Sequence, residues 1–187
     1  GKPAEARRMT PAEAARRQVV VGISDLKVSR DRESTLVTYA LGSCVAVCVY
    51  DALAQIGGML HIMLPDSALD SRKAETNPCM FADTGLPKLV AEMTRAGAQF
   101  RNLKVRLAGG AQVMNDGGLF SIGKRNYTAI RKSLWKAGLL VEGEAVGGEV
   151  SRTVRMEIAT GRLWVREGGG SEHEIPLRGT RNVYGLK

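Results

Sequence analysis

The fold of this chain is decided by two neighbouring segments, TYALGSCVAVCVYD at residues 38–51 and GGMLHIMLP at residues 57–65. The first is apolar and rich in valine from residue 45 to residue 50, and the second is apolar throughout residues 58–64. Unbroken apolar runs of this length are typical of strands that are buried on both faces. We therefore expect two central strands, with the turn between them lying within residues 51–57.

The register in which these two strands pair determines whether the Cys44 thiol lies next to the His61 imidazole. In an antiparallel hairpin that pairs Tyr50 with Gln55, Cys44 lies directly opposite His61 on the same face, with Cβ atoms roughly 4.5–5.5 Å apart. A thiol and an imidazole at that separation can share a proton, which is what a cysteine nucleophile requires. A slip of one residue would place the two side chains on opposite faces, so the prediction depends on the register.

The rest of the chain predicts an α+β fold, with mixed, mostly antiparallel β-sheet layers and two main helices packed on one face. Apolar periodicity places the first helix over residues 81–100, capped by Asp83 or Thr84, and Pro87 sets its start near residue 84. The second helix is expected over residues 121–136. The further predicted strands cover residues 19–23, 26–28, 36–40, 103–108, 139–141, 150–159 and 162–167.

Length and composition favour a single domain over residues 18–187, because 187 residues with 44% hydrophobic content can bury a substantial core. Residues 1–17 carry five basic and two acidic residues with few large apolar groups, which predicts a flexible, basic N-terminal tail. Residues 66–77 are polar and are expected to form a loop beside His61. The glycine-rich residues 109–118 match neither a dinucleotide-binding motif nor a P-loop, and they predict close backbone packing beside a site.

The net charge of +8 and the pI of about 9.7 permit nucleic acid, an anionic surface or an acidic protein as a partner. No run of Lys and Arg is longer than two residues and no aromatic residues are interleaved with them, which favours an acidic protein over nucleic acid. No apolar run approaches 18 residues, so membrane insertion is not expected. The three cysteines lack the spacing of a disulfide framework or a zinc site, which suits a reducing cytoplasm and predicts no metal or other cofactor.

Cys44 is the cysteine best placed for chemistry. Cys48 lies inside the valine-rich run, where a cysteine is usually core filler, and Cys79 has no obvious partner. Cys44 instead follows Gly42 and Ser43 at the start of the strand, where successive backbone N–H groups could face a developing oxyanion. Of the two histidines, His173 lies in a polar, glycine-rich segment and is expected to be a solvated loop residue, whereas His61 lies in the apolar strand.

The pattern of these residues resembles the CheD family of chemoreceptor glutamine deamidases. The resemblance rests on TYALGSCV and GGMLHIMLP around Cys44 and His61, on FADTGLP at residues 81–87, on the Gly109-Gly-Ala turn and on IGKRN at residues 122–126. It covers roughly residues 18–165. It implies a fold related to the catalytic domain of cytotoxic necrotizing factor toxins and a Cys-His-Thr triad, which maps onto Cys44, His61 and Thr38.

The resemblance also implies an activity and partners. Members hydrolyse selected glutamine side chains of chemoreceptor cytoplasmic domains to glutamate, through a thioester on the cysteine, and the same intermediate could form from glutamyl methyl esters. The implied roles are nucleophile for Cys44, proton carrier for His61 and orienting group for Thr38, and pairing with imidazolium is expected to lower the pKa of Cys44. Two alternatives remain open at this point: a binding module that associates with a CheC-type phosphatase, and a transamidating enzyme in which an amine replaces water.

Overall fold

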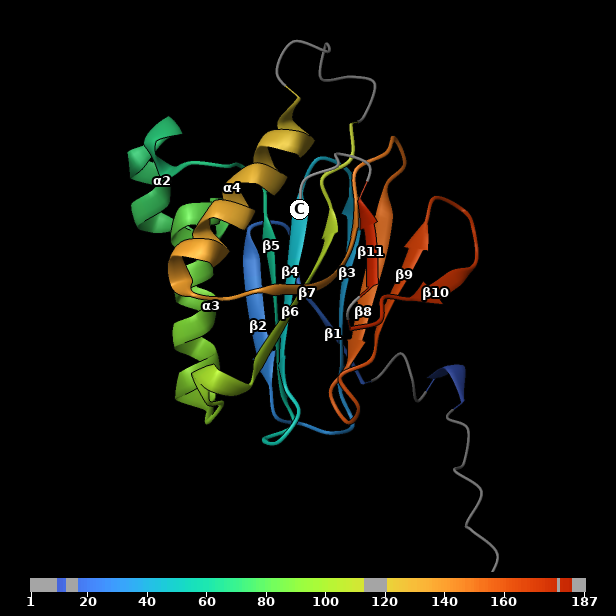
Figure 1. Cartoon of the computed structure of the whole chain (residues 1–187). Helices are drawn as coiled ribbons and strands as arrows, with labels where there is room; N and C mark the ends of the chain where they lie inside the picture. Colours follow the sequence, from blue (N-terminus) through green and yellow to red (C-terminus); the bar gives the residue numbers. More distant parts are fainter. Residues whose placement is uncertain (1–9, 13–16, 113–120, 178, 183–187) are drawn as a thin grey trace, which may run out of the picture.

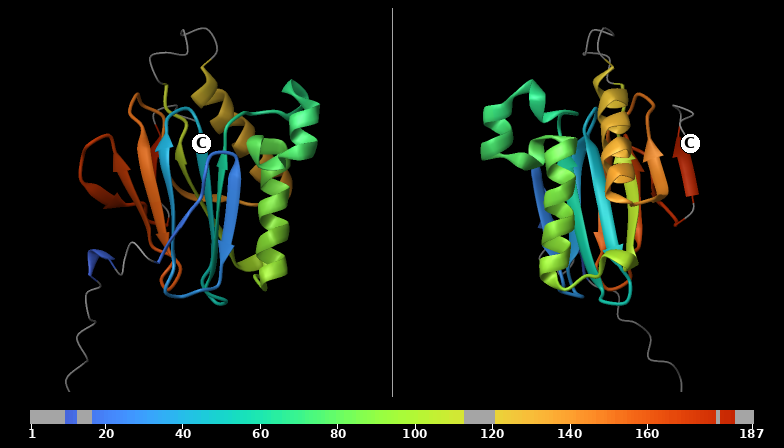
Figure 2. Two further views of the ribbon diagram at one scale, coloured as in Figure 1. Left: turned by 180° about the vertical axis from the view of Figure 1, so that it is seen from behind. Right: turned by 60° about the vertical axis from the view of Figure 1, so that its left-hand side comes forward.

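The computed structural model describes residues 10–12, 17–112, 121–177 and 179–182. Two β-sheets lie face to face. Two helices cover one of these sheets, on the face that points away from the other sheet (Figures 1 and 2). Both sheets contain parallel and antiparallel pairs, with antiparallel pairs in the majority. The predicted α+β class with mixed sheets and two main helices on one face is confirmed. The likeness to cytotoxic necrotizing factor toxins stays a prediction.

The helix-covered sheet contains the two strands that the sequence singled out. Its strand order is β11-β7-β6-β4-β5-β2, so β4 lies between β5 and β6 and pairs with both in the antiparallel direction. Every residue of β4 and β5 is buried, as their apolar runs predicted. The strands of this sheet are β2 (Asp25–Ser29), β4 (Val45–Asp51), β5 (Ile56–Ile62), β6 (Leu103–Gly109), β7 (Val141–Val146) and β11 (Gly179–Asn182).

The second sheet, called here the outer sheet, has the order β1-β3-β8-β9-β10. Its strand β3 contributes one of the predicted site residues. The predicted strands at residues 150–159 and 162–167 form a hairpin, with Met156 paired to Leu163 and the turn at Thr160 and Gly161. The strands of the outer sheet are β1 (Gln18–Val20), β3 (Thr35–Leu41), β8 (Arg152–Glu157), β9 (Leu163–Glu167) and β10 (Glu172–Glu174).

The register predicted for the central hairpin is wrong. Tyr50 pairs with Gly57 rather than with Gln55, and Asp51 pairs with Ile56. The cause is the loop, which is four residues long because the Asp51 carboxylate accepts hydrogen bonds from the N–H groups of Leu53 and Ala54, each at 3.0 Å. A hydrogen bond from an Asp side chain to the backbone N–H two residues further on stabilises such a turn, whereas pairing Tyr50 with Gln55 would have left only residues 52 and 53 for the loop.

Both main helices are present, and the first ends at Ala96, four residues before the end of the predicted range 81–100. Helix α3 (Ala82–Ala96) begins two residues before the predicted start, with Pro87 inside it and Phe81 at its cap. The predicted cap Asp83 instead accepts hydrogen bonds from the N–H and the hydroxyl of Ser67, at 2.9 and 2.5 Å. Helix α4 covers Ile122–Ala137 and α2 covers Ser71–Thr76 in the stretch predicted as a loop. Short 3-10 turns are η1 (Ser67–Leu69), η2 (Pro78–Met80) and η3 (Phe100–Asn102).

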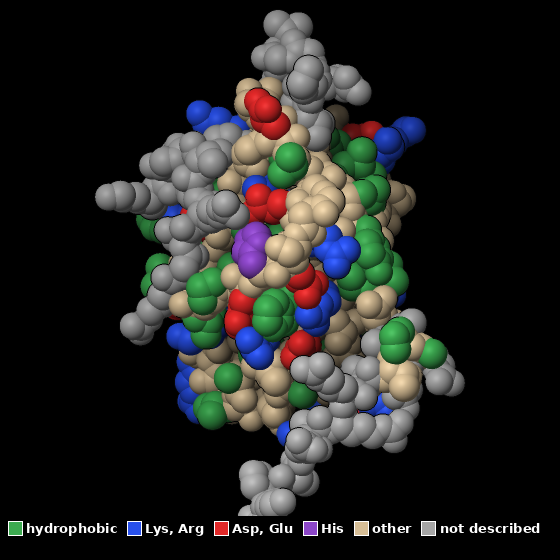
Figure 3. Space-filling view, turned by 90° about the vertical axis from the view of Figure 1, so that its right-hand side faces the viewer, with side chains coloured by type: hydrophobic (Ala, Val, Ile, Leu, Met, Phe, Trp, Pro, Cys, Tyr) green, Lys and Arg blue, Asp and Glu red, His purple; other side chains and the backbone are tan. Residues whose placement is uncertain are grey.

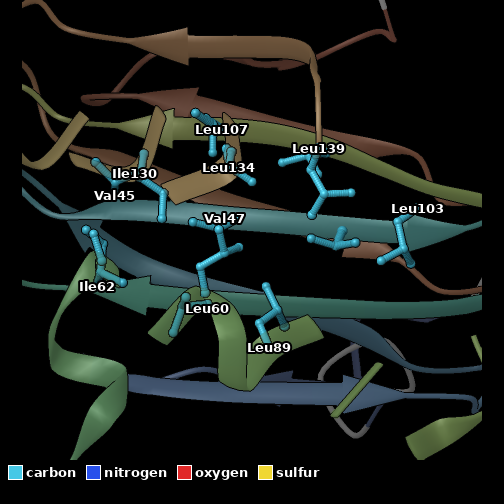
Figure 4. Packing of buried hydrophobic residues seen from close by; sticks show 14 of the residues in the cluster. Val45, Val47, Leu60, Ile62, Leu89, Leu103, Leu107, Ile130, Leu134 and Leu139 are labelled. Carbon is cyan, nitrogen blue, oxygen red and sulfur yellow. The ribbon is translucent and has the colours of Figure 1, made fainter. Parts of the chain in front are cut away.

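Two hydrophobic clusters hold these layers together. One lies between the helix-covered sheet and helices α3 and α4, and Figure 4 shows how Val47 and Leu60 of the sheet face Leu89 and Leu134 of the helices. The other fills the space between the two sheets. No described helix is long and apolar enough to cross a membrane. The predicted N-terminal tail lies mostly outside the described residues, as does the second half of the glycine-rich connector at residues 109–118.

Candidate active site

His61 and Thr38 meet across the space between the two sheets. His61 lies on β5 and Thr38 on β3, and both side chains are fully buried. The Thr38 Oγ1 atom is 2.7 Å from His61 Nδ1. Directly after Thr38, the pairing of β3 with β8 shifts register before it resumes at Leu41, and Ala40 there has a φ of 56°. Irregularities of this kind are frequent next to functional sites, where they redirect side chains.

The partners of Thr38 determine which imidazole nitrogen carries the proton. The hydroxyl of Thr38 donates to the carbonyl oxygen of Val21 at 2.7 Å. Because a hydroxyl has only one proton, Thr38 Oγ1 accepts its second hydrogen bond from His61 Nδ1–H. The Nε2 atom of the neutral ring is then unprotonated, and it is buried with no hydrogen-bond partner among the described residues. His61 therefore carries a free lone pair at Nε2, which is the form that a general base requires.

Cys44 directly precedes β4 on the face that carries His61. Its side chain is partly exposed and packs against the cluster between the sheets. Ala46, two residues further along the same face, is the residue that pairs with His61. Because the observed register differs from the predicted one by two residues, the side chains of Cys44 and His61 stay on one face, although they are not directly opposite each other.

The backbone that leads to Cys44 is bonded to the end of β6. Gly110 N–H donates to the carbonyl oxygen of Cys44, and Ala111 N–H donates to that of Gly42, each at 2.8 Å. Gly109 has a φ of 108°, and a Cβ atom at this position would collide with the carbonyl oxygen of Cys44. Only glycine combines this backbone conformation with such a close approach. The described part of the glycine-rich connector therefore packs beside Cys44, as predicted.

Asn126 is a site residue that the sequence analysis did not identify. It lies in the second turn of α4, is fully buried, and donates from Nδ2 to the carbonyl oxygens of Ser43 at 2.9 Å and Met63 at 3.0 Å. These bonds connect the residue before Cys44 with the residue two places after His61. The sequence contained a signal for it, because Asn126 occupies the same apolar stripe of the helix as Ile130 and Leu134, four and eight residues further on.

Burial shifts both titratable groups toward their neutral forms. It lowers the pKa of His61 from 6.5 to about 4. It also raises the pKa of the Cys44 thiol, against the smaller opposing effect of a hydrogen bond from the cysteine's own backbone. The prediction that an imidazolium lowers the pKa of Cys44 is therefore wrong for the protein without substrate. At neutral pH the site contains a thiol and a neutral imidazole, so the proton has to move during the reaction.

The other predicted candidates divide into two groups. The N–H of Gly42 donates to the carbonyl oxygen of Ala40 at 3.0 Å, so it is occupied, and the N–H groups of Ser43 and Cys44 are the remaining candidates for an oxyanion site. Cys48 is buried in the cluster between the sheets, as predicted for a core residue, and Cys79 is buried in the cluster between the sheet and the helices. Within the described ranges, no group of three or more His, Cys, Asp or Glu side chains could hold a metal ion.

A comparison with protein-family models matches residues 63–167 to the family described as CheD, chemotactic sensory transduction. This stretch begins two residues after His61 and includes Asn126, whereas Thr38 and Cys44 lie before it.

Individual relatives cover more of the chain. A protein of Solibacter usitatus named "Probable chemoreceptor glutamine deamidase CheD" is 54% identical over 159 residues, which are 85% of this chain and 94% of the relative. A protein of Syntrophus aciditrophicus named "Probable chemoreceptor glutamine deamidase CheD 1" is 48% identical over 84% of this chain and 98% of its own length. "Chemoreceptor glutamine deamidase CheD" of Thermotoga maritima is 41% identical over 83% and 96%. Because these relatives match along nearly their whole length, the chain belongs to the CheD family.

Proposed function

We propose that this protein deamidates glutamine side chains of chemoreceptor cytoplasmic domains, with Cys44 as nucleophile, His61 as general base and acid, and Thr38 as the group that orients His61. The names of the relatives supply the reaction and the substrate class. The observation that carries the residue assignment is the hydrogen bond from His61 Nδ1–H to Thr38. It leaves His61 Nε2 buried and without a partner among the described residues, on the same face of the sheet as the Cys44 side chain.

The first half of the reaction moves one proton and exchanges one bond. As Cys44 Sγ attacks the carboxamide carbon, its proton passes to His61 Nε2, and the carbonyl oxygen becomes an oxyanion. The N–H groups of Ser43 and Cys44 are the proposed donors to that oxyanion. His61 then gives the proton to the nitrogen of the collapsing intermediate. The C–N bond breaks, ammonia leaves, and a thioester joins Cys44 to the substrate.

The second half repeats these steps with water. His61 Nε2 accepts a proton from the water molecule that attacks the thioester carbon, and the C–S bond breaks as the proton returns to Cys44. The products are a glutamate side chain and the free thiol. Throughout the cycle Thr38 accepts from Nδ1, which keeps the unprotonated nitrogen at Nε2 and also stabilises the imidazolium that forms transiently.

The burial of the site is consistent with this order of events. His61 is fully buried, whereas Cys44 is partly exposed. A substrate side chain therefore contacts the thiol first, and the buried imidazole exchanges protons with the thiol from the protein side. The raised pKa of Cys44 and the lowered pKa of His61 make a resting ion pair unfavourable. Proton transfer is therefore coupled to attack, in contrast to cysteine enzymes that hold a preformed thiolate.

Mass spectrometry of receptor fragments provides the direct test. A chemoreceptor cytoplasmic fragment incubated with the protein should gain the small mass that accompanies each conversion of glutamine to glutamate, and ammonia should appear in equal amount. The Cys44→Ala variant is the matched control and should produce neither. An unchanged fragment mass with the wild-type protein would contradict the proposed activity.

The same site extends to two related reactions. Glutamyl methyl esters would form the same thioester with methanol leaving in place of ammonia, so we propose ester hydrolysis as a second activity. A transamidating enzyme would need an amine as acceptor, and product formation without added amine distinguishes hydrolysis from it. Association with a CheC-type phosphatase and a cytoplasmic location stay predictions from the family resemblance.

A further inference from the structure

Residues of helices α3 and α4 line an open groove. These helices lie on the face of the helix-covered sheet that points away from the outer sheet (Figures 1 and 2). The volume of the groove is about 790 Å³. Apolar side chains of α3 form one wall, and the solvent-facing side of α4 forms the other. The charged residues that line it are four cations and two carboxylates, namely Lys124, Arg125, Lys132, Lys136, Asp66 and Asp83.

The cations of the groove outnumber its carboxylates by four to two. Among the described residues none of the four forms an ion pair, whereas Asp83 already accepts two hydrogen bonds from Ser67. Lys132 and Lys136 are four residues apart on one helix, so they repel each other and weaken the helix slightly. Basic side chains gathered in a concave surface attract anions more strongly than the same charges spread over a convex one.

The outer sheet shows the opposite arrangement. On the face seen in Figure 3, Lys and Arg side chains are interspersed with Asp and Glu. Arg155 bonds to Glu172 at 2.6 Å, and Arg162 bonds to Glu174 at 3.0 Å. These pairs compensate one another, in contrast to the four cations of the groove, for which no ion pair is found among the described residues.

One end of the groove is connected through Asn126 to the backbone segments that precede Cys44 and follow His61, on the helix side of the helix-covered sheet. The groove residue Arg125 is the neighbour of Asn126, which bonds to the carbonyl oxygen of Ser43 directly before Cys44. Pro65 lines the same end and follows Met63, the second partner of Asn126, by two residues. From Lys124 to Lys136 the helix rises by about 18 Å, since each residue adds roughly 1.5 Å. The cations of the groove therefore extend along α4 from the end that is connected to the segment before Cys44.

We propose that this groove is a docking surface for an acidic segment of the substrate protein next to the reactive glutamine, an inference that rests on the proposed function. The chemistry of that function supplies the charge complementarity, because every deamidation converts a neutral amide into a carboxylate. A substrate with several sites becomes more acidic with each turnover, and a carboxylate made earlier binds the groove while a later glutamine reaches Cys44.

The test compares two double variants with equal charge. Lys132→Glu with Lys136→Glu alters the groove, and Arg30→Glu with Arg101→Glu alters exposed cations at the other end of the molecule. Arg30 follows Ser29, which pairs at the start of β5, and Arg101 precedes β6, whose first residue pairs with the last residue of β4. Each pair replaces two positive charges by two negative ones, so both variants change the net charge from +8 to +4. Equal thermal unfolding midpoints would show that both are folded.

At low ionic strength the groove variant should lose at least about tenfold in kcat/KM on a chemoreceptor cytoplasmic fragment. The control variant should lose less than about threefold. Its charges adjoin the end of the strand β4 that is remote from Cys44, about 20 Å along the strand, and this exceeds the Debye length of roughly 8–10 Å. The ratio of fragment activity to activity on a short neutral glutamine peptide should fall only in the groove variant. Equal losses in the two variants would overturn the docking proposal and leave the deamidase function standing.

A second measurement separates the two proposals if no deamidation is found. A fluorescently labelled glutamate-rich peptide is titrated with the wild-type protein and with both variants, and binding is followed by anisotropy. Tighter binding to the wild type and the control than to the groove variant would support the groove even in the absence of activity. Equal affinities for all three proteins would reject it.

Discussion

His61 Nδ1 lies 2.7 Å from Thr38 Oγ1, and this hydrogen bond joins β5 of one sheet to β3 of the other. The hydroxyl proton of Thr38 is already donated to the carbonyl oxygen of Val21, so Thr38 accepts from His61 Nδ1–H. This bond holds the imidazole in the tautomer with Nε2 unprotonated. A single threonine thus determines both the orientation and the protonation of the histidine that we propose as general base.

We expect Thr38→Val to reduce kcat strongly, but by less than His61→Ala does, because an orienting group contributes less than the proton carrier itself. Thr38→Ser keeps the hydroxyl and should recover most of the activity. Steady-state deamidation of a receptor fragment measures all three variants. If Thr38→Val were as active as the wild type, another group would have to orient His61.

Cys44 should be the only one of the three cysteines that reacts readily with iodoacetamide in the folded protein. Its side chain is partly exposed, whereas Cys48 and Cys79 have exposed fractions of 1% and 4%, and burial raises the pKa of Cys48 to about 12. Peptide mapping after brief alkylation identifies the modified residue. Cys44→Ala should abolish deamidation, while Cys48→Ala and Cys79→Ala should keep most of it in the folded fraction. Full activity in Cys44→Ala would remove the proposed nucleophile.

Asn126→Ala should lower both stability and activity. The substitution removes the hydrogen bonds from a buried side chain to the carbonyl oxygens of Ser43 and Met63, at a cost of roughly 1–3 kcal/mol in the free energy of unfolding. It also frees the segment before Cys44, so the rate of Cys44 alkylation should change well below the unfolding temperature. Trp135→Ala, on the exposed side of the same helix, is the control and should change neither quantity appreciably. An unchanged alkylation rate in Asn126→Ala would limit its role to stability.

Acid should destabilise the protein through His61. The pKa of this histidine falls from 6.5 to about 4 on burial, so between these pH values the unfolded chain binds the proton more tightly than the folded one. The stabilisation is complete above pH 6.5 and is lost as the pH falls toward 4. It amounts to roughly 3 kcal/mol, since each pKa unit corresponds to about 1.4 kcal/mol.

Urea unfolding from pH 7 to pH 4 checks this expectation when the wild type is compared with His61→Gln. The carboxylates titrate in both proteins, so the difference between their two curves isolates the contribution of His61. The wild type should lose stability faster than the variant as the pH falls. Parallel curves would show that the imidazole is protonated as easily in the folded state as in the unfolded chain.

Local patterns in the sequence determined the parts of the fold that depend on neighbouring residues. The apolar runs of β4 and β5 identified the central strands, and Gly97 and Gly138 end the two main helices with φ values of 111° and 77°. The period of two along a strand placed Cys44 and His61 on one face, and an error of two residues in the register did not change that result.

The tertiary structure alone decided which groups complete the site. Asp51 sets the length of the hairpin loop through hydrogen bonds, and so it moves Ala46 into the position opposite His61. The distance of 2.7 Å between Thr38 and His61 arises only when two sheets stack, and the bonds of Asn126 arise only when a helix packs beside strands that are more than 60 residues away in the chain. Strand and helix periodicity report which face of an element is apolar. They carry no information about which distant element will cover that face, because that choice depends on loop lengths and on packing of the whole chain.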